Sequence, residues 1–290
     1  MNKNLRIIVI GGGAAGFFGA IACKEKNPSS SVILLEKAKQ VLAKVRISGG
    51  GRCNVTHACF DASAVVKNYP RGEKALKSAF LRFGPQDTIE WFLKRGVPLK
   101  TEADGRMFPV TDSSETIIQC LMRAASKAGV VLKTETSVQA IEKIENVFHL
   151  TLANEQVLIC DKLLVATGSS LKMHEILKVL GHKIEPHVPS LFTFNVPNSP
   201  LSSLSGIAVP KAHLKIPQGK LEQQGALLIT HFGFSGPAVL KLSAFGARVL
   251  ADLNYETDLL IDWLPDVSHE DLKNCLLMYK QENGLKQMQT

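Results

Sequence analysis

The chain has 290 residues, of which 45% are hydrophobic and 21% charged, and its formal net charge at pH 7 is +8. This ordinary globular composition suits one large domain or two modest ones. No apolar run approaches the roughly 18 residues of a membrane-spanning helix, and the six cysteines form neither a C-x-x-C pair nor a dense framework. We therefore expect a cytoplasmic protein with reduced thiols, no membrane association and no metal site.

Positive charge is concentrated in the first part of the chain. Residues 1–100 contain 17 lysines and arginines against 6 aspartates and glutamates, whereas residues 101–290 contain 17 against 20. Such an excess attracts an anionic dinucleotide, an anionic substrate or a nucleic acid, and it is also typical of a solvated surface. Because the basic residues are scattered and no nucleic-acid motif is present, we expect a small-molecule substrate and no nucleic-acid partner. The sequence leaves the oligomeric state open.

The first 36 residues predict a dinucleotide-binding βαβ unit. An apolar strand, residues 5–10, precedes the glycine turn Gly11–Gly16, a helix and a second apolar strand, residues 32–35, which ends at Glu36. In this G-x-G-x-x-G pattern the first glycine permits the turn, the second lets the backbone approach a pyrophosphate, and the third lets the helix pack on the strand. The same glycines argue against a secretory leader. The predicted cofactor contacts are Gly11, Gly13, Ala14, Ala15, Gly16, Glu36 and Lys37.

Residues 37–60 are predicted to form a loop dominated by a glycine-rich segment. Three consecutive glycines let backbone N–H groups converge on an oxyanion or a flavin edge, and Arg52 adds a planar cation. A structural turn is the alternative, although a turn rarely needs three glycines and an arginine. Cys53 is expected to be a buried small residue rather than a redox thiol, and His57 is a candidate proton donor. The residues predicted to approach the cofactor are Ser48, Gly49, Gly50, Gly51, Arg52 and Asn54.

Helices and then strands are expected in the middle of the chain. The spacing of apolar residues predicts three helices, over residues 73–83, 87–95 and 114–128. An alternating pattern then predicts a β-meander with strands at residues 130–133, 138–144, 147–152 and 156–159. A buried strand, residues 163–166, follows and ends at Thr167-Gly168. This order suits the flavin-binding type of Rossmann domain rather than a simple nicotinamide dehydrogenase.

The composition changes near residues 186–189. The following segment is rich in proline, serine and glycine with short alternating strands, and two helices are expected after it, over residues 236–250 and 268–280. Ser235 is expected to cap the first of these helices, and His231 is a candidate for substrate contact. The expected domains are a Rossmann-like FAD-binding domain over residues 1–187 and a β-rich and helical domain over residues 188–290.

Four segments together resemble the bacterial family of FAD-dependent oxidoreductases variously labelled aminoacetone-oxidase-like or predicted flavoproteins. They are Val9–Gly16, Ile47–His57, Asp104–Pro109 and Thr230–Pro237. The second segment is the most specific, and the resemblance covers essentially the whole chain. It implies an α/β fold with a glutathione-reductase-type Rossmann FAD-binding domain, an inserted β-rich second domain and bound FAD.

The resemblance also implies further contacts and two departures. The additional cofactor contacts are Lys44, the backbone of Val138 beside adenine, Thr167 and Gly168. For Val138 an ordinary strand residue is the alternative. Leu42 and Arg46 stand where many relatives carry a glycine and an apolar residue. The family's glycine-rich closing segment has no counterpart after residue 190, so the chain is expected to correspond to the first two thirds of a family member.

The function implied by these features is that of an FAD-dependent oxidoreductase with an unidentified small-molecule substrate. The flavin carries the electrons, while the protein supplies orientation, electrostatics and exclusion of water. No second G-x-G-x-x-G motif is present, so an NAD(P)H donor would dock transiently at the flavin. The alternatives are a dehydrogenase that uses only NAD and a truncated, catalytically inactive flavoprotein remnant. No acid–base pair identifies the catalytic residues.

Overall fold

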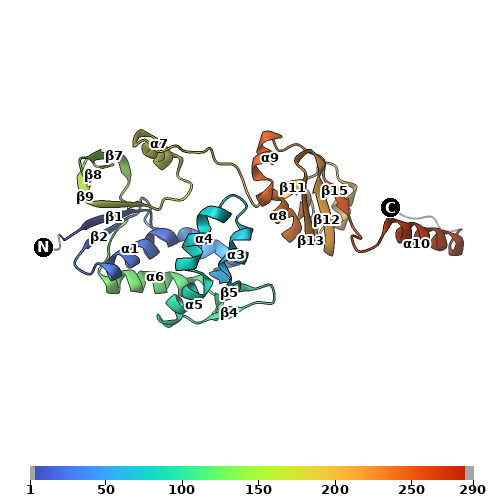
Figure 1. Cartoon of the computed structure of the whole chain (residues 1–290), viewed down its shortest axis with the longest axis horizontal. Coiled ribbons are helices and arrows are strands. Elements are labelled where there is room, and N and C mark those ends of the chain that lie inside the picture. The colour runs from blue at the N-terminus through green and yellow to red at the C-terminus, as the bar shows by residue number, and fades with distance from the viewer. Residues whose placement is uncertain (1–3, 285–290) are drawn as a thin grey trace. The chain divides into compact units, whose positions relative to one another are not determined.

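The computed structural model describes residues 4–284 of the chain. Its internal contacts divide the chain into two units after Glu185, two residues before the expected end of the first domain. Unit 1 contains the glycine motifs and unit 2 contains the β-rich remainder (Figure 1). Within residues 4–284, no helix combines the length and the apolar character required to cross a bilayer.

A parallel sheet forms the centre of unit 1. Its strands lie in the order β10 (Lys162–Val165), β1 (Arg6–Ile10), β2 (Ser31–Leu35) and β6 (Val131–Lys133). Side chains alternate across β1, so Val9 faces one core and Ile8 faces another. Burial on both faces explains why this strand is a continuous apolar run. The first core is closed by helices α1 (Ala14–Lys26) and α6 (Ser114–Ala128).

The second core lies between the parallel sheet and an antiparallel meander. The meander strands are β7 (Val138–Ile144), β8 (Val147–Leu152) and β9 (Val157–Cys160). Helix α7 (Leu171–Val179) adds Met173 to this core. In Figure 1 the meander and the pair α1 and α6 lie on opposite sides of the sheet. This layering confirms the α/β Rossmann arrangement that the order of elements predicts.

Two strand predictions are corrected by the sheet pairing. Residues 130–133, predicted as the first meander strand, form β6 and pair with β2 in the parallel sheet. The chain reaches β6 from helix α6, and a strand–helix–strand crossover returns it parallel to the earlier strand; alternation alone does not reveal a strand's partner. The strand predicted as buried is β10, which is only half-buried because it lies at an edge of the described sheet.

The expected loop over residues 37–60 is also corrected, because it contains helix α2 (Ala43–Ile47). This helix packs against α6, and the Ser114 hydroxyl donates to the carbonyl oxygen of Arg46 at 2.7 Å. The Arg46 guanidinium forms an ion pair with Glu115. Helix α6 therefore accommodates a charged residue at a position where the resemblance implies an apolar one.

The three helices predicted in unit 1 are present, but the one predicted over residues 87–95 starts and ends two residues earlier, at Pro85 and Leu93. Pro85 is the first residue of its helix, Ser113 accepts a hydrogen bond from the Glu115 backbone N–H at 3.3 Å, and Gly129 ends that helix with φ +84°. The shorter helices are α3 (Ala62–Val65), α4 (Glu73–Arg82) and α5 (Pro85–Leu93). A small antiparallel sheet has the order β3 (Thr56–His57), β5 (Arg106–Pro109) and β4 (Leu99–Thr101).

Unit 2 is built on an antiparallel sheet with its own core. The strand order is β11 (Phe194–Asn195), β14 (Gly233–Ser235), β13 (Leu221–Thr230), β12 (Ala208–Ile216) and β15 (Leu260–Asp262). Helix α8 (Pro237–Phe245) covers the sheet and buries Leu242 against it. The helices that follow are α9 (Ala247–Asp252) and α10 (His269–Glu282).

The predicted capping role of Ser235 is wrong. Ser235 is the last residue of β14, and the cap of α8 is Gly236, which has φ +98°. A Cβ at this glycine would lie 2.9 Å from the carbonyl oxygen of Ala226. The helix therefore starts in close contact with β13, and that contact requires glycine at the cap.

Candidate functional site

The glycine turn after β1 is shaped by two close backbone approaches. Gly11 has φ +111°, and a Cβ there would lie 2.4 Å from the carbonyl oxygen of Ala166. A Cβ on Gly16 would lie 1.8 Å from the carbonyl oxygen of Gly11. Neither space admits a side chain, so these two glycines allow β1, α1 and the end of β10 to converge.

The middle glycine of the motif has a different environment. Gly13 caps α1 with φ −88°, no side chain caps the helix, and a Cβ there would meet no atom within 4 Å. Ala14 and Ala15 in the first turn are exposed, and that turn contains no acidic residue. The helix N-terminus therefore presents backbone N–H groups and partial positive charge to open space, which is a favourable place for a phosphate.

Glu36 closes the turn from the end of β2. Its carboxylate accepts hydrogen bonds from the backbone N–H groups of Gly12 at 2.7 Å and Ala38 at 2.9 Å. Each carboxylate oxygen retains lone pairs that can accept from ribose hydroxyls. Lys37 beside it is exposed. The sequence predicts the ribose contact of Glu36, whereas its hydrogen bond to the glycine turn emerges only in the folded chain.

The loop beyond Glu36 runs beside the entry to the meander. The Thr136 backbone N–H donates to the carbonyl oxygen of Glu36 at 2.9 Å. Val138, the predicted adenine contact, begins β7 two residues later and is buried. The structure thus brings the start of the meander next to the end of β2, although the Val138 side chain itself belongs to the second core.

The carboxyl end of β10 completes this edge of the sheet. The Ala166 backbone N–H donates to the carbonyl oxygen of Ile10 at 2.8 Å, and Gly168 has φ +60°. A Cβ on Gly168 would lie 3.8 Å from the Lys44 ammonium nitrogen. Lys44 on α2 and the Thr167-Gly168 turn therefore lie close together, and their contact with a cofactor stays a prediction.

Leu42, just before α2, adopts a left-handed backbone conformation with φ +57° and is buried. Its backbone N–H donates to the carbonyl oxygen of Gly12 at 2.8 Å, which ties the start of α2 to the glycine turn. A left-handed conformation favours glycine over leucine. This geometry gives a physical reason for the glycine that the resemblance implies at this position.

The predicted glycine-rich loop is a left-handed turn. Gly49, Gly50 and Gly51 have φ values of +56°, +67° and +85°. A Cβ on Gly49 would lie 3.0 Å from the Phe108 ring, whereas Cβ atoms on Gly50 and Gly51 would meet nothing within 4 Å. The first glycine is thus required for packing, and the other two expose bare backbone to open space. The Ser48 hydroxyl, just before this turn, donates to the carbonyl oxygen of Val45 in helix α2 at 2.8 Å.

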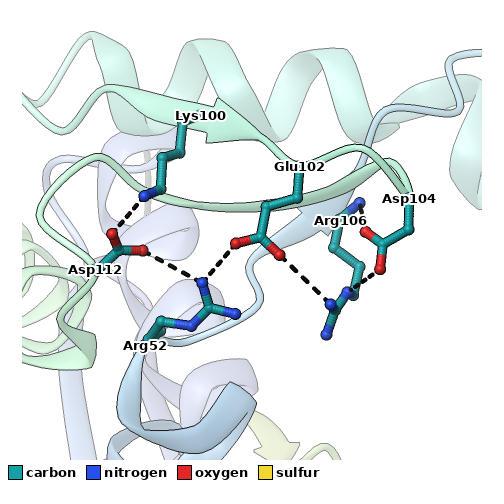
Figure 2. Close-up of polar contacts among 6 residues, drawn as sticks. All are labelled: Arg52, Lys100, Glu102, Asp104, Arg106 and Asp112. Atoms are coloured by element: carbon teal, nitrogen blue, oxygen red, sulfur yellow. Dashed lines mark hydrogen bonds and ion pairs between the residues drawn. The ribbon is translucent and has the colours of Figure 1, made fainter. Parts of the chain in front are cut away.

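Arg52 is anchored in a network of charged side chains (Figure 2). Its guanidinium lies 2.5 Å from the Glu102 carboxylate and 3.5 Å from that of Asp112, and it stacks 4.0 Å from the centroid of the Phe108 ring. The hydrogen bond to Glu102 raises the pKa of Arg52 above its usual value. Figure 2 shows Glu102 between Arg52 and Arg106. Within this network Arg52 fixes the end of the glycine turn to the β4–β5 hairpin.

Sequence reasoning missed the partners of Arg52. Glu102 and Asp112 lie 50 and 60 positions beyond it, in and after the β4–β5 hairpin. The motif around Arg106 draws attention to this hairpin, but it does not indicate that Arg52 is the side chain with which Glu102 and Asp112 pair. Lys100 also joins the network through Asp112.

The stability of this hairpin is expected to fall when the pH drops below the ordinary carboxyl pKa of 3.8. A backbone hydrogen bond from Arg106 lowers the pKa of Asp104, and a hydrogen bond from Lys100 lowers the pKa of Asp112. A carboxylate with a lower pKa in the folded state contributes stability above its unfolded pKa, and this contribution is lost as the pH falls through the folded pKa. Hydrogen exchange of the β4–β5 amides should therefore accelerate in acid. The double substitution Asp104→Asn and Asp112→Asn should remove that dependence, and an unchanged acid response would assign it to other groups.

Cys53 and His57 take structural positions beside the loop. Cys53 is buried, and burial raises the pKa of its thiol, as expected for a small packed residue rather than a redox thiol. His57 is exposed, and its Nε2 lies 3.0 Å from the carbonyl oxygen of Asp104. Its ring also packs on Gly105, where a Cβ would lie 2.4 Å away. Among residues 4–284, no group of three or more His, Cys, Asp or Glu side chains is placed to hold a metal ion.

Two solved structures match part of this chain with low sequence identity. The structure of THI4 from Thermovibrio ammonificans matches with a TM-score of 0.42 and 12% identity, covering 62% of this chain and 64% of that chain. The FrdA subunit of Escherichia coli quinol fumarate reductase matches with a TM-score of 0.42 and 14% identity, covering 57% of this chain and 32% of that chain.

Matches to curated sequences and to a family model cover more of this chain than the matches to solved structures do. The ribosomal RNA dihydrouridine synthase of Escherichia coli (strain K12) is 30% identical over 301 residues, covering 97% of this chain and 72% of that protein. The 3-dehydro-bile acid delta(4,6)-reductase of Clostridium scindens is 26% identical over 280 residues, covering 93% of this chain and 67% of that protein. A family model described as the HI0933-like protein Rossmann domain matches residues 5–280. The chain therefore belongs to the HI0933-like family, a Rossmann-type FAD-binding family of flavoproteins.

Proposed function

We propose that this flavoprotein is a reductase that saturates a ring carbon–carbon double bond conjugated to a carbonyl group. The observation that carries the flavin part is the convergence of an open helix N-terminus, Glu36, Lys44 and Gly168 at the carboxyl edge of one parallel sheet. The names of the two relatives support the direction of the reaction. One makes dihydrouridine, and the other reduces delta(4,6) bonds of a 3-dehydro bile acid.

The residues at the sheet edge fit the ADP half of FAD. The space in front of Gly13 would admit a pyrophosphate, because a Cβ there meets no atom within 4 Å. The uncapped N-terminus of α1 and the Lys44 ammonium group supply positive charge. Glu36 is already oriented by two backbone N–H groups and would accept from ribose hydroxyls. Its charge would repel a phosphorylated ribose.

The glycine turn at Gly49–Gly51 fits the flavin half. Gly50 and Gly51 leave open space in front of bare backbone, where a planar ring can approach closely. Arg52 holds this turn through Glu102 and Asp112, so we propose that it shapes the loop that meets the ring. When bound, FAD supplies hydride chemistry, and the chain's own residues orient it and exclude water.

The electron donor and the substrate are further parts of the proposal. We propose NAD(P)H as a transient donor, because the chain has one G-x-G-x-x-G motif. A small conjugated ring compound is the first candidate substrate. A uracil within RNA is the second, favoured by the excess of basic residues in residues 1–100 and by the name of the Escherichia coli relative.

The test begins with the nucleotide released when the purified protein is denatured. Release of FAD supports the proposal, and release of NAD alone overturns it. The protein is then reduced anaerobically with NADH or NADPH and mixed with a conjugated cyclic enone, uridine or a uridine-containing RNA. Oxidation of the flavin with formation of the saturated product supports a reductase. Oxygen consumption with aminoacetone, and no reaction with the unsaturated rings, would favour the oxidase activity that the family label implies.

Replacing Glu36 by alanine is expected to weaken FAD binding by about ten- to a hundredfold. The substitution removes the acceptor for the ribose hydroxyls, and a hydrogen bond to a charged group is worth about 1.5–3 kcal/mol. It also removes the acceptor for the Gly12 and Ala38 backbone N–H groups. Titration of the apoprotein with FAD measures the effect. Glu36→Gln retains an acceptor oxygen and is the matched control. Equal affinity in wild type and Glu36→Ala would remove Glu36 from the ribose site.

A further inference from the structure

Unit 2 contains a small cavity beside the turn that connects β13 and β14. Its volume is about 240 Å³, and it lies between that turn and the segment that follows β11. The turn is held tightly, because a Cβ on Gly233 would lie 2.1 Å from the carbonyl oxygen of Phe194. The Val196 backbone N–H also donates to the carbonyl oxygen of Phe232 at 2.8 Å. The two walls of the cavity are thus fixed to each other by backbone contacts.

The lining of this cavity is polar but uncharged. No lysine, arginine, aspartate or glutamate of the described chain lines it. Five polar side chains line the cavity, and one of them, Ser199, accepts a hydrogen bond from the Leu201 backbone N–H at 3.2 Å. The other four form no side-chain hydrogen bond within residues 4–284, and they are those of Asn195, Asn198, Ser202 and His231. Donors and acceptors are therefore available from two amides, a hydroxyl and an imidazole. One wall is the Phe232 ring, which is 53% exposed.

We propose that this cavity binds a neutral planar ring whose edge alternates hydrogen-bond donors and acceptors, as in the cyclic imide of uracil. An exposed aromatic face offers a stacking surface for such a ring. Side-chain amides carry a donor and an acceptor on one group and pair with an imide edge. The uncharged lining disfavours a phosphate or carboxylate as the bound group. The volume lies below the roughly 300–1,000 Å³ of sites for drug-sized ligands, so it suits one ring rather than a fused polycyclic skeleton.

This assignment rests on the proposed function in one respect, since a uracil-like ring is one of the conjugated rings that a reductase of this kind would saturate. Binding in unit 2 requires only the turn and the segment described above. The presence of the ring site and the presence of flavin can therefore be measured separately on one sample of the full chain.

The experiment is a calorimetric titration of the full chain with uridine, 3-methyluridine and hexauridylate. Uridine should bind saturably, and 3-methyluridine should bind more weakly because its N3 donor is blocked. Tighter binding of hexauridylate than of uridine would identify RNA as the source of the ring, and equal binding would identify the free nucleoside. Both results support the site.

The variants test whether the binding occurs in this cavity. Phe232→Ala removes the stacking face and should weaken uridine binding about tenfold or more. Phe245→Ala is the matched control, because Phe245 lies in the same unit, is 41% exposed and does not line the cavity. Asn198→Gly removes an amide while retaining the left-handed backbone, φ +56°, that Asn198 adopts, and it should also weaken binding.

Three results would overturn the ring site. They are no saturable uridine binding by the folded chain, equal affinity for uridine and 3-methyluridine, and equal effects of the Phe232 and Phe245 substitutions. If FAD is released on denaturation but uridine does not bind, the ring site alone fails. If uridine binds at the cavity but no FAD is released, the proposed function alone fails.

Discussion

Replacing Gly16 by alanine is expected to destabilise unit 1 by about 3 kcal/mol or more, the upper end of the range for overpacked sites. The added Cβ would lie 1.8 Å from the carbonyl oxygen of Gly11, and relief requires α1 to move away from β1. Alanine is favoured over glycine inside a helix by about 1 kcal/mol, so any loss reports the steric contact. Urea unfolding followed by circular dichroism measures the change. Hydrogen exchange should show β1 and β2 amides losing protection while those of β12 and β13 keep theirs.

The control is the same substitution three residues earlier. Gly13→Ala places its methyl group where no atom lies within 4 Å, at an extended backbone position that any residue adopts. Its stability should stay within about 1 kcal/mol of wild type, the modest cost of alanine at a helix cap. If Gly16→Ala were as stable as Gly13→Ala, the close crossing of α1 and β1 would not be a requirement of the fold.

Replacing Gly13 by aspartate is expected to act on stability and on FAD binding in opposite directions. Aspartate is a favoured cap residue, and its carboxylate would accept from the free N–H groups of the first turn, adding a few tenths of a kcal/mol of stability. The same carboxylate would occupy and repel the proposed pyrophosphate position. The loss of charged hydrogen bonds worth about 1.5–3 kcal/mol corresponds to about a ten- to hundredfold weaker affinity. Thermal unfolding and titration with FAD measure the two effects.

The neutral cap Gly13→Ser separates charge from size in this comparison. Serine also caps helices well but carries no charge, so it should retain more FAD affinity than aspartate. Equal affinity in wild type and Gly13→Asp would place the phosphates elsewhere than at the α1 N-terminus. An aspartate variant that loses both stability and affinity would show that the open space in front of Gly13 is needed by the fold itself.

The local sequence pattern was sufficient to predict an element where all the residues that specify it are neighbours in the sequence. At the N-terminus, apolar runs predict the strands, and the glycine pattern predicts the turn and the start of the helix. In the structure, Gly11 and Gly16 lie where a side chain would collide with the backbone. Helix α6 was predictable for the same reason, because Ser113 at its start and Gly129 at its end act on their own neighbours in sequence. The α/β fold class follows from the order of the helices and strands predicted in this way.

The tertiary structure decided the features that depend on a distant partner. Residues 131–133 alternate like a meander strand, yet they pair with β2 because the α6 crossover carries them there. The guanidinium of Arg52 can pair with any nearby carboxylate, and only the folded structure shows that Glu102 is its partner. The sequence by itself therefore determined the βαβ unit, the helices and the Rossmann class of this protein. Folding decided which strands pair, which carboxylates contact Arg52, and how the two segments that line the unit 2 cavity come together. These contacts join residues far apart in the sequence, so no local periodicity of the sequence predicts them.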